Sequence, residues 1–255
     1  MRVIDKTRTW RTLRNTLEGT IGFVPTMGAL HRGHASLLER SVDENDFTVL
    51  SIYVNPTQFN NPDDLDNYPD TMEDDLVLAK RLGVDVVIRP TYNDMYADGY
   101  RYQVDENEFS RTLCGEHRSG HFTGVLTVVM KLLNLVLPTR AYFGKKDYQQ
   151  YRLISDMVET FFMNVEIVGC ETIRECDGLA VSSRNINLNG ETRKVAPRLH
   201  KLLTSPYSDE DVAKKLAAVG FDVDYLVTRG RRRFAAASLD SNGLAVRLID
   251  NVECA

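Results

Sequence analysis

The 255-residue sequence has four cysteines, at positions 114, 170, 176 and 254, and no two of them are spaced as Cys-x-x-Cys. Neither a zinc ribbon nor a thioredoxin-type redox motif is therefore indicated, and free thiols are expected. Residues 1–15 are charged and contain no apolar run, so we expect no signal peptide. The longest apolar tract, over 125–137, is interrupted by Lys131 and is too short to cross a bilayer. These absences predict a cytoplasmic protein that does not enter a membrane.

The common nucleotide and metal motifs are missing as well. The sequence contains no Gly-x-Gly-x-x-Gly, no P-loop of the form Gly-x4-Gly-Lys-Ser/Thr and no His-Glu-x-x-His. The 36 acidic residues outnumber the 31 lysines and arginines, which gives a net charge of −5. Because this charge disfavours general binding to nucleic acid or anionic lipid, we expect neither partner. Any anion that binds must be held by a local cluster of donors.

Strand-like and helix-like tracts alternate over residues 1–169. Apolar runs predict strands over 20–25, 47–54, 84–89, 141–143 and 165–168, with a further short strand over 100–104. Helical spacing predicts helices over 34–42, 72–82, 123–137 and 148–162. Between them lies a Pro- and Asp-rich stretch over 55–71. The alternation predicts an α/β domain with a Rossmann-like parallel sheet and flanking helices.

The composition changes from about residue 170. A segment rich in Asp, Ser, Arg and Asn precedes predicted helices over 191–203 and 208–219 and predicted strands over 224–228 and 244–249. We therefore expect a second, small α+β domain over 170–255. The run Arg-Gly-Arg-Arg-Arg at 229–233 is interpreted as a solvated turn, and a phosphate contact is the alternative.

Residues 25–34 read PTMGALHRGH and connect the first predicted strand to the first predicted helix. Gly28 and Gly33 allow a ligand to approach the backbone closely, and the start of a helix presents unpaired N–H groups that suit phosphate. His31 and His34 are three residues apart, so they share one face of a helical turn. Two imidazoles there can donate hydrogen bonds to a departing pyrophosphate. The alternative is a pair of surface histidines beside a turn.

These residues resemble a known family. The His-x-Gly-His string is similar to the signature of the nucleotidylyltransferase superfamily, and the longer string PTMGALHRGHASL resembles the pantothenate synthetase (pantoate–β-alanine ligase) family. Four further blocks occur in that family's order: VNPTQF at 54–59 with YP at 68–69, LCGEHRSGHF at 113–122, FGKKDYQQ at 143–150 and RECDGLAVSSRN at 174–185. The tail RLIDN at 247–251 is also similar.

The resemblance implies an AMP-forming ligase of coenzyme A biosynthesis. In such an enzyme (R)-pantoate attacks the α-phosphate of ATP to give pantoyl adenylate and pyrophosphate, and β-alanine then displaces AMP. The resemblance also implies Mg²⁺ with ATP and a homodimer. The alternatives are a nucleotidylyltransferase that stops at the nucleotidyl product and a catalytically silent nucleotide-binding protein.

The resemblance further assigns residues to ligands. The catalytic residues would be His31, His34, Lys146 and Arg184. ATP would be bound by Met27, Gly28, Ala29, Leu30, His31, Arg32, Gly33, His34, Gly144, Lys145, Lys146, Asp147, Ile173, Val181, Ser182, Ser183 and Arg184. Pantoate would be bound by Gln58 and Gln150, and β-alanine by Gln58 and Tyr68.

Several of these residues have ordinary alternatives. Lys146 is a candidate phosphate ligand, but most lysines are solvated surface residues. Ser182 and its neighbours resemble a mobile phosphate-binding loop, and the alternative is a turn that caps the next helix. Asp74 and Asp75 are candidate Mg²⁺ ligands, although acidic residues also stabilise the first turn of a helix without any metal.

The block at 113–122 contains a second histidine pair. His117 and His121 are four residues apart and have the spacing of a zinc pair, but no further ligand is apparent, so gating or a dimer contact is favoured. Three positions depart from the family: Asp70 replaces the usual Arg, Ser119 the usual Pro and Val181 the usual Met. The C-terminal part is also shorter than usual.

Overall fold

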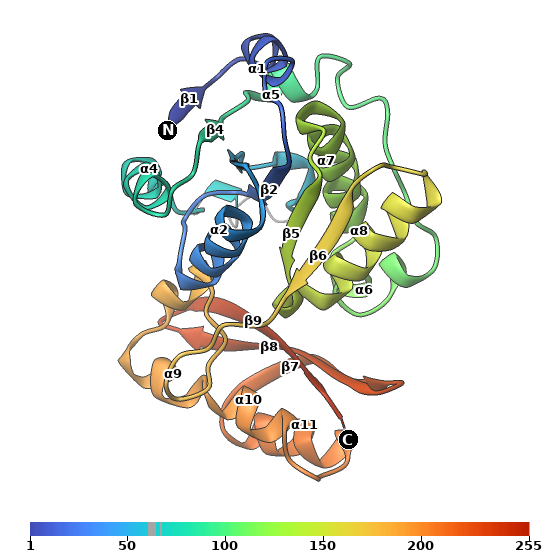
Figure 1. Cartoon of the computed structure of the whole chain (residues 1–255). Helices are drawn as coiled ribbons and strands as arrows, with labels where there is room; N and C mark the ends of the chain where they lie inside the picture. Colours follow the sequence, from blue (N-terminus) through green and yellow to red (C-terminus); the bar gives the residue numbers. More distant parts are fainter. Residues whose placement is uncertain (61–64, 67, 255) are drawn as a thin grey trace. The chain divides into compact units, whose positions relative to one another are not determined.

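The structure is a computed structural model that describes residues 1–60, 65–66 and 68–254. Part of the Pro- and Asp-rich stretch predicted over 55–71 therefore lies outside the described residues. The chain divides into two compact units (Figure 1). Unit 1 comprises Met1–Lys145 and Gln149–Cys170, and unit 2 comprises Lys146–Tyr148 and Glu171–Ala255.

Unit 1 is built on a six-stranded sheet with the order β1-β4-β3-β2-β5-β6, in which every neighbouring pair is parallel. The strands are β1 (Arg2–Ile4), β2 (Ile21–Thr26), β3 (Phe47–Ile52), β4 (Val86–Ile88), β5 (Arg140–Gly144) and β6 (Glu166–Cys170). The central strands are buried along almost their whole length, as is typical of parallel sheets covered on both faces. The predicted Rossmann-like α/β sheet is confirmed.

The helices predicted over 34–42, 72–82, 123–137 and 148–162 correspond closely to α2 (Arg32–Glu44), α4 (Met72–Arg81), α7 (His121–Val136) and α8 (Tyr148–Thr160). The structure also contains α1 (Thr7–Arg14), α5 (Tyr92–Met95) and α6 (Cys114–His117), which were not predicted, and the single 3₁₀ turns η1 (Pro56–Gln58), η2 (Phe109–Arg111) and η3 (Lys145–Asp147). One face of the sheet packs against α2 and α4. No helix among the described residues is long and apolar enough to span a membrane.

The prediction of a strand over 100–104 is wrong. This segment runs in irregular conformation, and the backbone N–H of Val104 donates to the hydroxyl of Thr127 on α7 at 2.9 Å. A side-chain acceptor thus satisfies the donor that a neighbouring strand would otherwise have satisfied.

The N-terminal helix α1 packs against the C-terminal end of α7. Trp10 is fully buried, and its indole N–H donates to the carbonyl of Leu135 at 2.8 Å. Arg14 donates to the carbonyls of Val136 and Leu137, each at 3.0 Å. These donors satisfy carbonyls that the end of a helix leaves without intrahelical partners.

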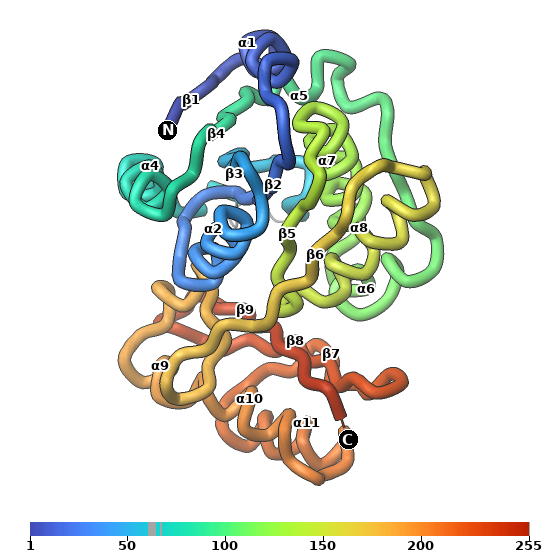
Figure 2. Tube along the Cα trace, in the orientation of Figure 1, coloured from blue at the N-terminus to red at the C-terminus, as the bar shows by residue number. Residues whose placement is uncertain are grey.

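Unit 2 combines short helices with a three-stranded antiparallel sheet of order β7-β8-β9, so the predicted small α+β region is confirmed. Its elements are η4 (Ser183–Asn187), α9 (Gly190–Val195), α10 (Arg198–Leu203), α11 (Asp209–Ala218), β7 (Phe221–Arg229), β8 (Arg232–Ser241) and β9 (Leu244–Glu253). Figure 2 shows the path of the chain through the helices into the hairpins. An apolar core joins the helices to one face of the sheet.

Two predictions in unit 2 need correction. The helix predicted over 191–203 is two helices, because Pro197 lies between α9 and α10 and cannot donate a helical hydrogen bond. The run at 229–233 is a solvated turn only at Gly230 and Arg231. Arg233 is a buried residue of β8, and it donates to the carbonyls of Leu203, Ser205 and Tyr207.

Candidate functional site

The segment PTMGALHRGH forms a tight turn between β2 and α2. Thr26 closes the end of β2: its hydroxyl donates to the carbonyl of Ser51 at 2.8 Å and accepts from the N–H of Gly28 at 3.2 Å. Gly28 and Ala29 both have left-handed backbones, with φ of +83° and +50°. A Cβ at position 28 would also lie 3.1 Å from the carboxylate of Asp75, so this turn needs glycine there.

Asp75 braces this turn from the first part of α4. Its two carboxylate oxygens accept from the backbone N–H groups of Ala29 at 2.9 Å and Leu30 at 2.8 Å. The side chain is buried, and burial raises its pKa against the opposing effect of these backbone hydrogen bonds. Asp75 thus fixes a turn whose left-handed conformation at Ala29 is unfavourable for a residue with a Cβ.

The pair Asp74 and Asp75 does not fit a resident magnesium site. Both oxygens of Asp75 already accept backbone hydrogen bonds, whereas Asp74 is exposed. Within the ranges that the structure describes, no group of three or more His, Cys, Asp or Glu side chains is placed to hold a metal ion. Oxygen-rich coordination of the kind that Mg²⁺ requires is therefore not assembled around this pair.

His31 and His34 are held by the first turn of α2. His31 is the N-cap, and its Nδ1 accepts from the N–H of Gly33 at 3.1 Å, while Nδ1 of His34 accepts from the N–H of His31 at 3.3 Å. The two rings stack with centroids 4.1 Å apart. Because each Nδ1 accepts, a neutral ring carries its proton on Nε2, which makes Nε2 the donor for a ligand.

Gln58 lies beside the same turn. Its amide nitrogen contacts the sulfur of Met27 at 3.2 Å, and its amide oxygen accepts from Asn55 at 3.1 Å. Asn55, which is almost fully buried, also accepts from the hydroxyl of Tyr96 at 2.9 Å. No role was predicted for Asn55 or Tyr96, although Asn55 lies in the VNPTQF block at 54–59. The structure therefore places the substrate candidate Gln58 next to the candidate nucleotide turn.

The backbone of Gln58 is fixed by α7. Its carbonyl accepts from Nδ1 of His121 at 2.8 Å, and Nε2 of His121 lies 3.1 Å from the guanidinium of Arg118. Both ring nitrogens of His121 thus have protein partners, which does not fit a zinc pair with His117. Gly124 brings α7 close to η1, because a Cβ there would lie 2.4 Å from the carbonyl oxygen of Thr57.

The other two substrate candidates have different surroundings. Tyr68 is half-buried, and its ring packs edge-to-face on Phe59 with centroids 5.7 Å apart. Gln150 is half-buried in the first turn of α8. Its neighbour Gln149 is instead structural, because it bonds the carbonyls of Phe109 and Thr112.

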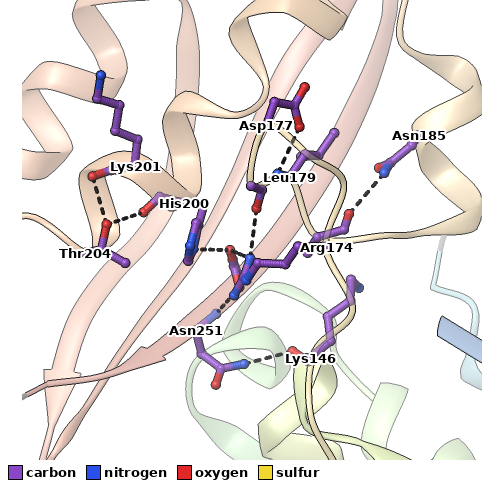
Figure 3. A network of polar contacts seen from close by, with 12 residues as sticks. Lys146, Arg174, Asp177, Leu179, Asn185, His200, Lys201, Thr204 and Asn251 are labelled. Atoms are coloured by element: carbon purple, nitrogen blue, oxygen red, sulfur yellow. Dashed lines mark hydrogen bonds and ion pairs between the residues drawn. The ribbon is translucent and has the colours of Figure 1, made fainter. Parts of the chain in front are cut away.

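The remaining nucleotide candidates follow β5 or lie in unit 2. Gly144 ends β5, and Lys145 begins η3. The Lys146 ammonium lies 3.7 Å from the carboxylate of Asp147, and the carbonyl of Lys146 accepts from the Asn251 amide at 2.9 Å (Figure 3).

In unit 2 the residues of the predicted phosphate loop make hydrogen bonds within their own segment. The N–H of Val181 donates to the carbonyl of Ile173 at 3.0 Å, which brings these two nucleotide candidates together. The Ser182 hydroxyl accepts from the N–H of Arg184 at 3.3 Å and caps η4. Ser182 thus makes the capping contact given as the alternative, and Ser183 and Arg184 form the first turn of η4.

Comparison with known proteins places the whole chain among relatives of one kind. A family model described as Pantoate-beta-alanine ligase matches residues 1–253. The chain is 56% identical over 240 residues to a pantothenate synthetase of Bdellovibrio bacteriovorus, covering 94% of each chain. It is 50% identical to one of Legionella pneumophila (strain Lens), covering 98% of this chain and 99% of that one.

Solved structures agree with the sequence relatives. A pantoate-beta-alanine ligase from Francisella tularensis, complexed with beta-gamma ATP and beta-alanine, is 40% identical with a TM-score of 0.92 and covers 99% of this chain and 97% of that one. A pantothenate synthetase from Thermus thermophilus is 39% identical with a TM-score of 0.88, covering 99% of each chain.

Proposed function

Since this chain belongs to the pantoate–β-alanine ligase family, we propose that His31, His34, Lys146 and Arg184 carry the family's reaction here. That reaction is the ATP-dependent condensation of (R)-pantoate with β-alanine to pantothenate through pantoyl adenylate, with release of AMP and pyrophosphate. The observation that carries the residue assignment is the stacked histidine pair, whose Nδ1 atoms are both tied to the N-terminal N–H groups of α2.

In the adenylation step a carboxylate oxygen of pantoate attacks the α-phosphorus of ATP. The bond from that phosphorus to the bridging α,β oxygen breaks, and pyrophosphate leaves with the electron pair. Negative charge grows on the leaving phosphates, where the Nε2–H groups of His31 and His34 and the positive end of α2 stabilise it. Lys146 and Arg184 donate charge-assisted hydrogen bonds to the phosphates and offset their negative charge.

The contact residues follow from the same assignment. It assigns ATP contacts to residues 27–34 and 144–147 and to Ile173, Val181, Ser182 and Ser183. The glycines among them let the nucleotide approach the backbone closely.

In the second step the amine of β-alanine attacks the acyl carbon of pantoyl adenylate. The carbon–oxygen bond to the phosphate breaks, AMP leaves, and the amine loses a proton to give the amide. Gln58 and Gln150 hold the hydroxyls and carbonyl of the pantoyl group, because amides both donate and accept. Gln58 and Tyr68 orient β-alanine. The Francisella relative in complex with beta-gamma ATP and beta-alanine supports a site for both ligands.

Magnesium enters this proposal as the counter-ion of ATP. The geometry of Asp75 does not suit a resident ion, because both of its carboxylate oxygens accept backbone hydrogen bonds. Mg²⁺ would accompany ATP and would supply positive charge to the triphosphate. Residues 1–169 act as the nucleotide- and pantoate-binding domain and 170–255 as a smaller lid domain. A cytoplasmic homodimer completes the proposal, and sedimentation equilibrium measures its mass.

The reaction is tested by leaving out one substrate at a time. With ATP and pantoate but no β-alanine, the purified protein is expected to exchange labelled pyrophosphate into ATP. With β-alanine added, it is expected to form equal amounts of pantothenate and AMP. A nucleotidylyltransferase would form no amide, and a silent nucleotide-binding protein would show a thermal shift with ATP but no exchange. Either result would reject the proposed function.

A further inference from the structure

The C-terminal block RLIDN holds two buried polar residues that the reaction has not yet used. Asp250 and Asn251 are adjacent on β9 and are 4% and 5% exposed. Successive side chains of a strand point to opposite faces of the sheet, so the two residues serve different neighbours. Asp250 follows Val246 and Leu248 on the face that carries the core of unit 2. Asn251 lies on the other face, across from Phe234 in the register of β8.

Asp250 fastens the segment that carries Ile173 and Val181. Its carboxylate receives two hydrogen bonds from the guanidinium of Arg174, at 2.7 and 2.9 Å, and His200 Nδ1 lies 3.4 Å away (Figure 3). Arg174 also donates to the carbonyl of Gly178 at 3.1 Å. A bidentate pair of this kind fixes the orientation of the guanidinium and of the loop attached to it.

Asn251 fastens the segment that carries Lys146. Its amide nitrogen donates to the carbonyl of Lys146 at 2.9 Å, across 105 residues of sequence. Its amide oxygen accepts from Arg232 at 2.7 Å. Arg232 in turn lies over the ring of Tyr148 with 4.1 Å to the centroid, and this ring lies 5.9 Å from that of Phe234. The turn at 146–148 is therefore held at its backbone and at a ring by one face of the β8–β9 pair.

The chemistry of both contacts requires an amide at position 251. A carbonyl only accepts and a guanidinium only donates, so the side chain must donate at one end and accept at the other. Aspartate would keep the contact with Arg232 and lose the donor to Lys146. Alanine would lose both.

We propose that Asn251 is a positioning residue for Lys146: by holding the Lys146 carbonyl, it sets the direction in which the lysine side chain leaves the backbone. The inference rests on the proposed function, in which the Lys146 ammonium binds the phosphates of ATP. Asn251 is assigned no contact with substrate or reacting atoms and acts through Lys146. Misplacing a charged group by about 1 Å is enough to cost about a hundredfold in rate.

The test compares four single variants in the pantoate-dependent exchange of pyrophosphate into ATP. Asn251→Asp and Asn251→Ala each remove the donor to Lys146, and Lys146→Ala removes the ammonium. Asn242→Asp is the matched control. Asn242 lies in the β8–β9 turn, and its side-chain oxygen accepts from Asn189 at 3.1 Å, so aspartate makes the same charge change and keeps that contact. The double variant Asn251→Asp/Lys146→Ala completes a mutant cycle.

Both Asn251 variants are expected to lower kcat of the exchange by about tenfold to a hundredfold. Asn242→Asp is expected to stay within about twofold of the unsubstituted protein, with melting temperatures recorded for all variants. In the Lys146→Ala background the Asn251→Asp change is expected to cost less than about twofold, because the group that it positions is gone. A purely structural role would give the same loss in both backgrounds.

Equal losses in the two backgrounds, or an Asn251 variant with full exchange activity beside an impaired Lys146→Ala, would overturn the inference and leave the proposed function standing. Full activity in Lys146→Ala would instead remove the phosphate role of Lys146, and the inference with it.

Discussion

At the scale of single residues, His31 and His34 each use Nδ1 for a contact within the fold, and the proposed function uses Nε2 of the same rings for the phosphates. Nδ1 of each ring satisfies a backbone N–H of the α2 N-terminus, so ring orientation and tautomer are set before any substrate binds. Such preorganised donors are effective because they need no rearrangement when charge develops.

The substitution His34→Ala removes one of these donors. We expect kcat of pyrophosphate exchange to fall by about a hundredfold, the usual scale for one preorganised hydrogen-bond donor. The helix start loses one cap contact as well, so the melting temperature should fall slightly. His117→Ala, which removes an exposed histidine, is the control. A loss below tenfold would mean that His34 does not contact the transition state.

A second residue-scale prediction concerns Asp75. In Asp75→Asn an NH₂ group replaces one acceptor, so either Ala29 or Leu30 loses its partner and the turn before His31 loosens. We expect kcat to fall about tenfold or more, while the Mg²⁺ concentration that gives half-maximal rate stays unchanged. Asp74→Asn, at an exposed neighbour, should change neither quantity. A raised Mg²⁺ requirement in Asp75→Asn would show instead that Asp75 binds the metal.

At the scale of elements, the contact between α7 and η1 determines where Gln58 lies. Gly124 permits that contact, because its missing side chain leaves room for the carbonyl of Thr57. His121 from the same helix then holds the Gln58 carbonyl. A helix whose apolar sequence indicated only a buried structural element thus also places a candidate substrate ligand.

Gly124→Ala tests this arrangement. A Cβ placed 2.4 Å from the Thr57 oxygen forces α7 and η1 apart, which we expect to cost about 1–3 kcal/mol of stability. Because η1 carries Gln58, KM for pantoate should rise at least severalfold. Gly190→Ala is the matched control, since a Cβ there meets nothing within 4 Å. Chemical denaturation measures the free energy of unfolding, and initial rates at varied pantoate concentration measure KM. An unchanged KM would show that Gln58 does not bind pantoate.

The elements also show which parts of the fold could be predicted from the sequence. Apolar runs and Gly-containing turns indicated the central strands of unit 1, because buried parallel strands are apolar throughout. Strand β8 was missed since its interior, FAAASLD, is rich in alanine, which has little preference for strands. Its place in the sheet depends on pairing with β7 and β9 along its whole length. The break at Pro197, by contrast, was visible in the sequence and was overlooked.

The same distinction applies to the candidate site. His31 and His34 could be singled out because they lie in one short motif after a strand. The brace from Asp75 and the contact from Asn251 could not, because each joins segments that only the fold brings together. For Asp75 the sequence indicated two roles, an Mg²⁺ ligand beside Asp74 or an acidic residue that stabilises the first turn of a helix, and neither is the contact with the turn before His31 that the fold makes.

At the scale of the whole molecule, acid stability depends on buried carboxylates such as Asp250. Burial raises the pKa of Asp250, but contacts with His200 and Arg174 outweigh it, so the pKa lies below the ordinary value of 3.8. A carboxyl with a lowered pKa stabilises the folded state above its unfolded pKa, and this contribution is lost as the pH falls towards the folded pKa.

The melting temperature of Asp250→Asn should therefore lie below that of the unsubstituted protein at neutral pH, because Arg174 loses its charged partner. The difference in melting temperature should narrow as the pH falls from about 4, the ordinary pKa of an aspartate in the unfolded chain, towards the lower pKa of Asp250 in the folded state. Thermal melts by circular dichroism over a pH series measure this gap. A difference in melting temperature that stays constant at all pH values would contradict the lowered pKa of Asp250.

The chain has one tryptophan, and its indole is enclosed where α1 meets the end of α7. Intrinsic fluorescence excited at that ring is consequently a site-specific signal that needs no label. Its emission maximum will shift to longer wavelength when water reaches the indole beside α7. Unfolding confined to the β7–β9 sheet, which contains no tryptophan, will leave this emission unchanged. Tryptophan fluorescence and circular dichroism of the peptide backbone, recorded on one sample, can thus distinguish unfolding around α1 from unfolding of the β7–β9 sheet.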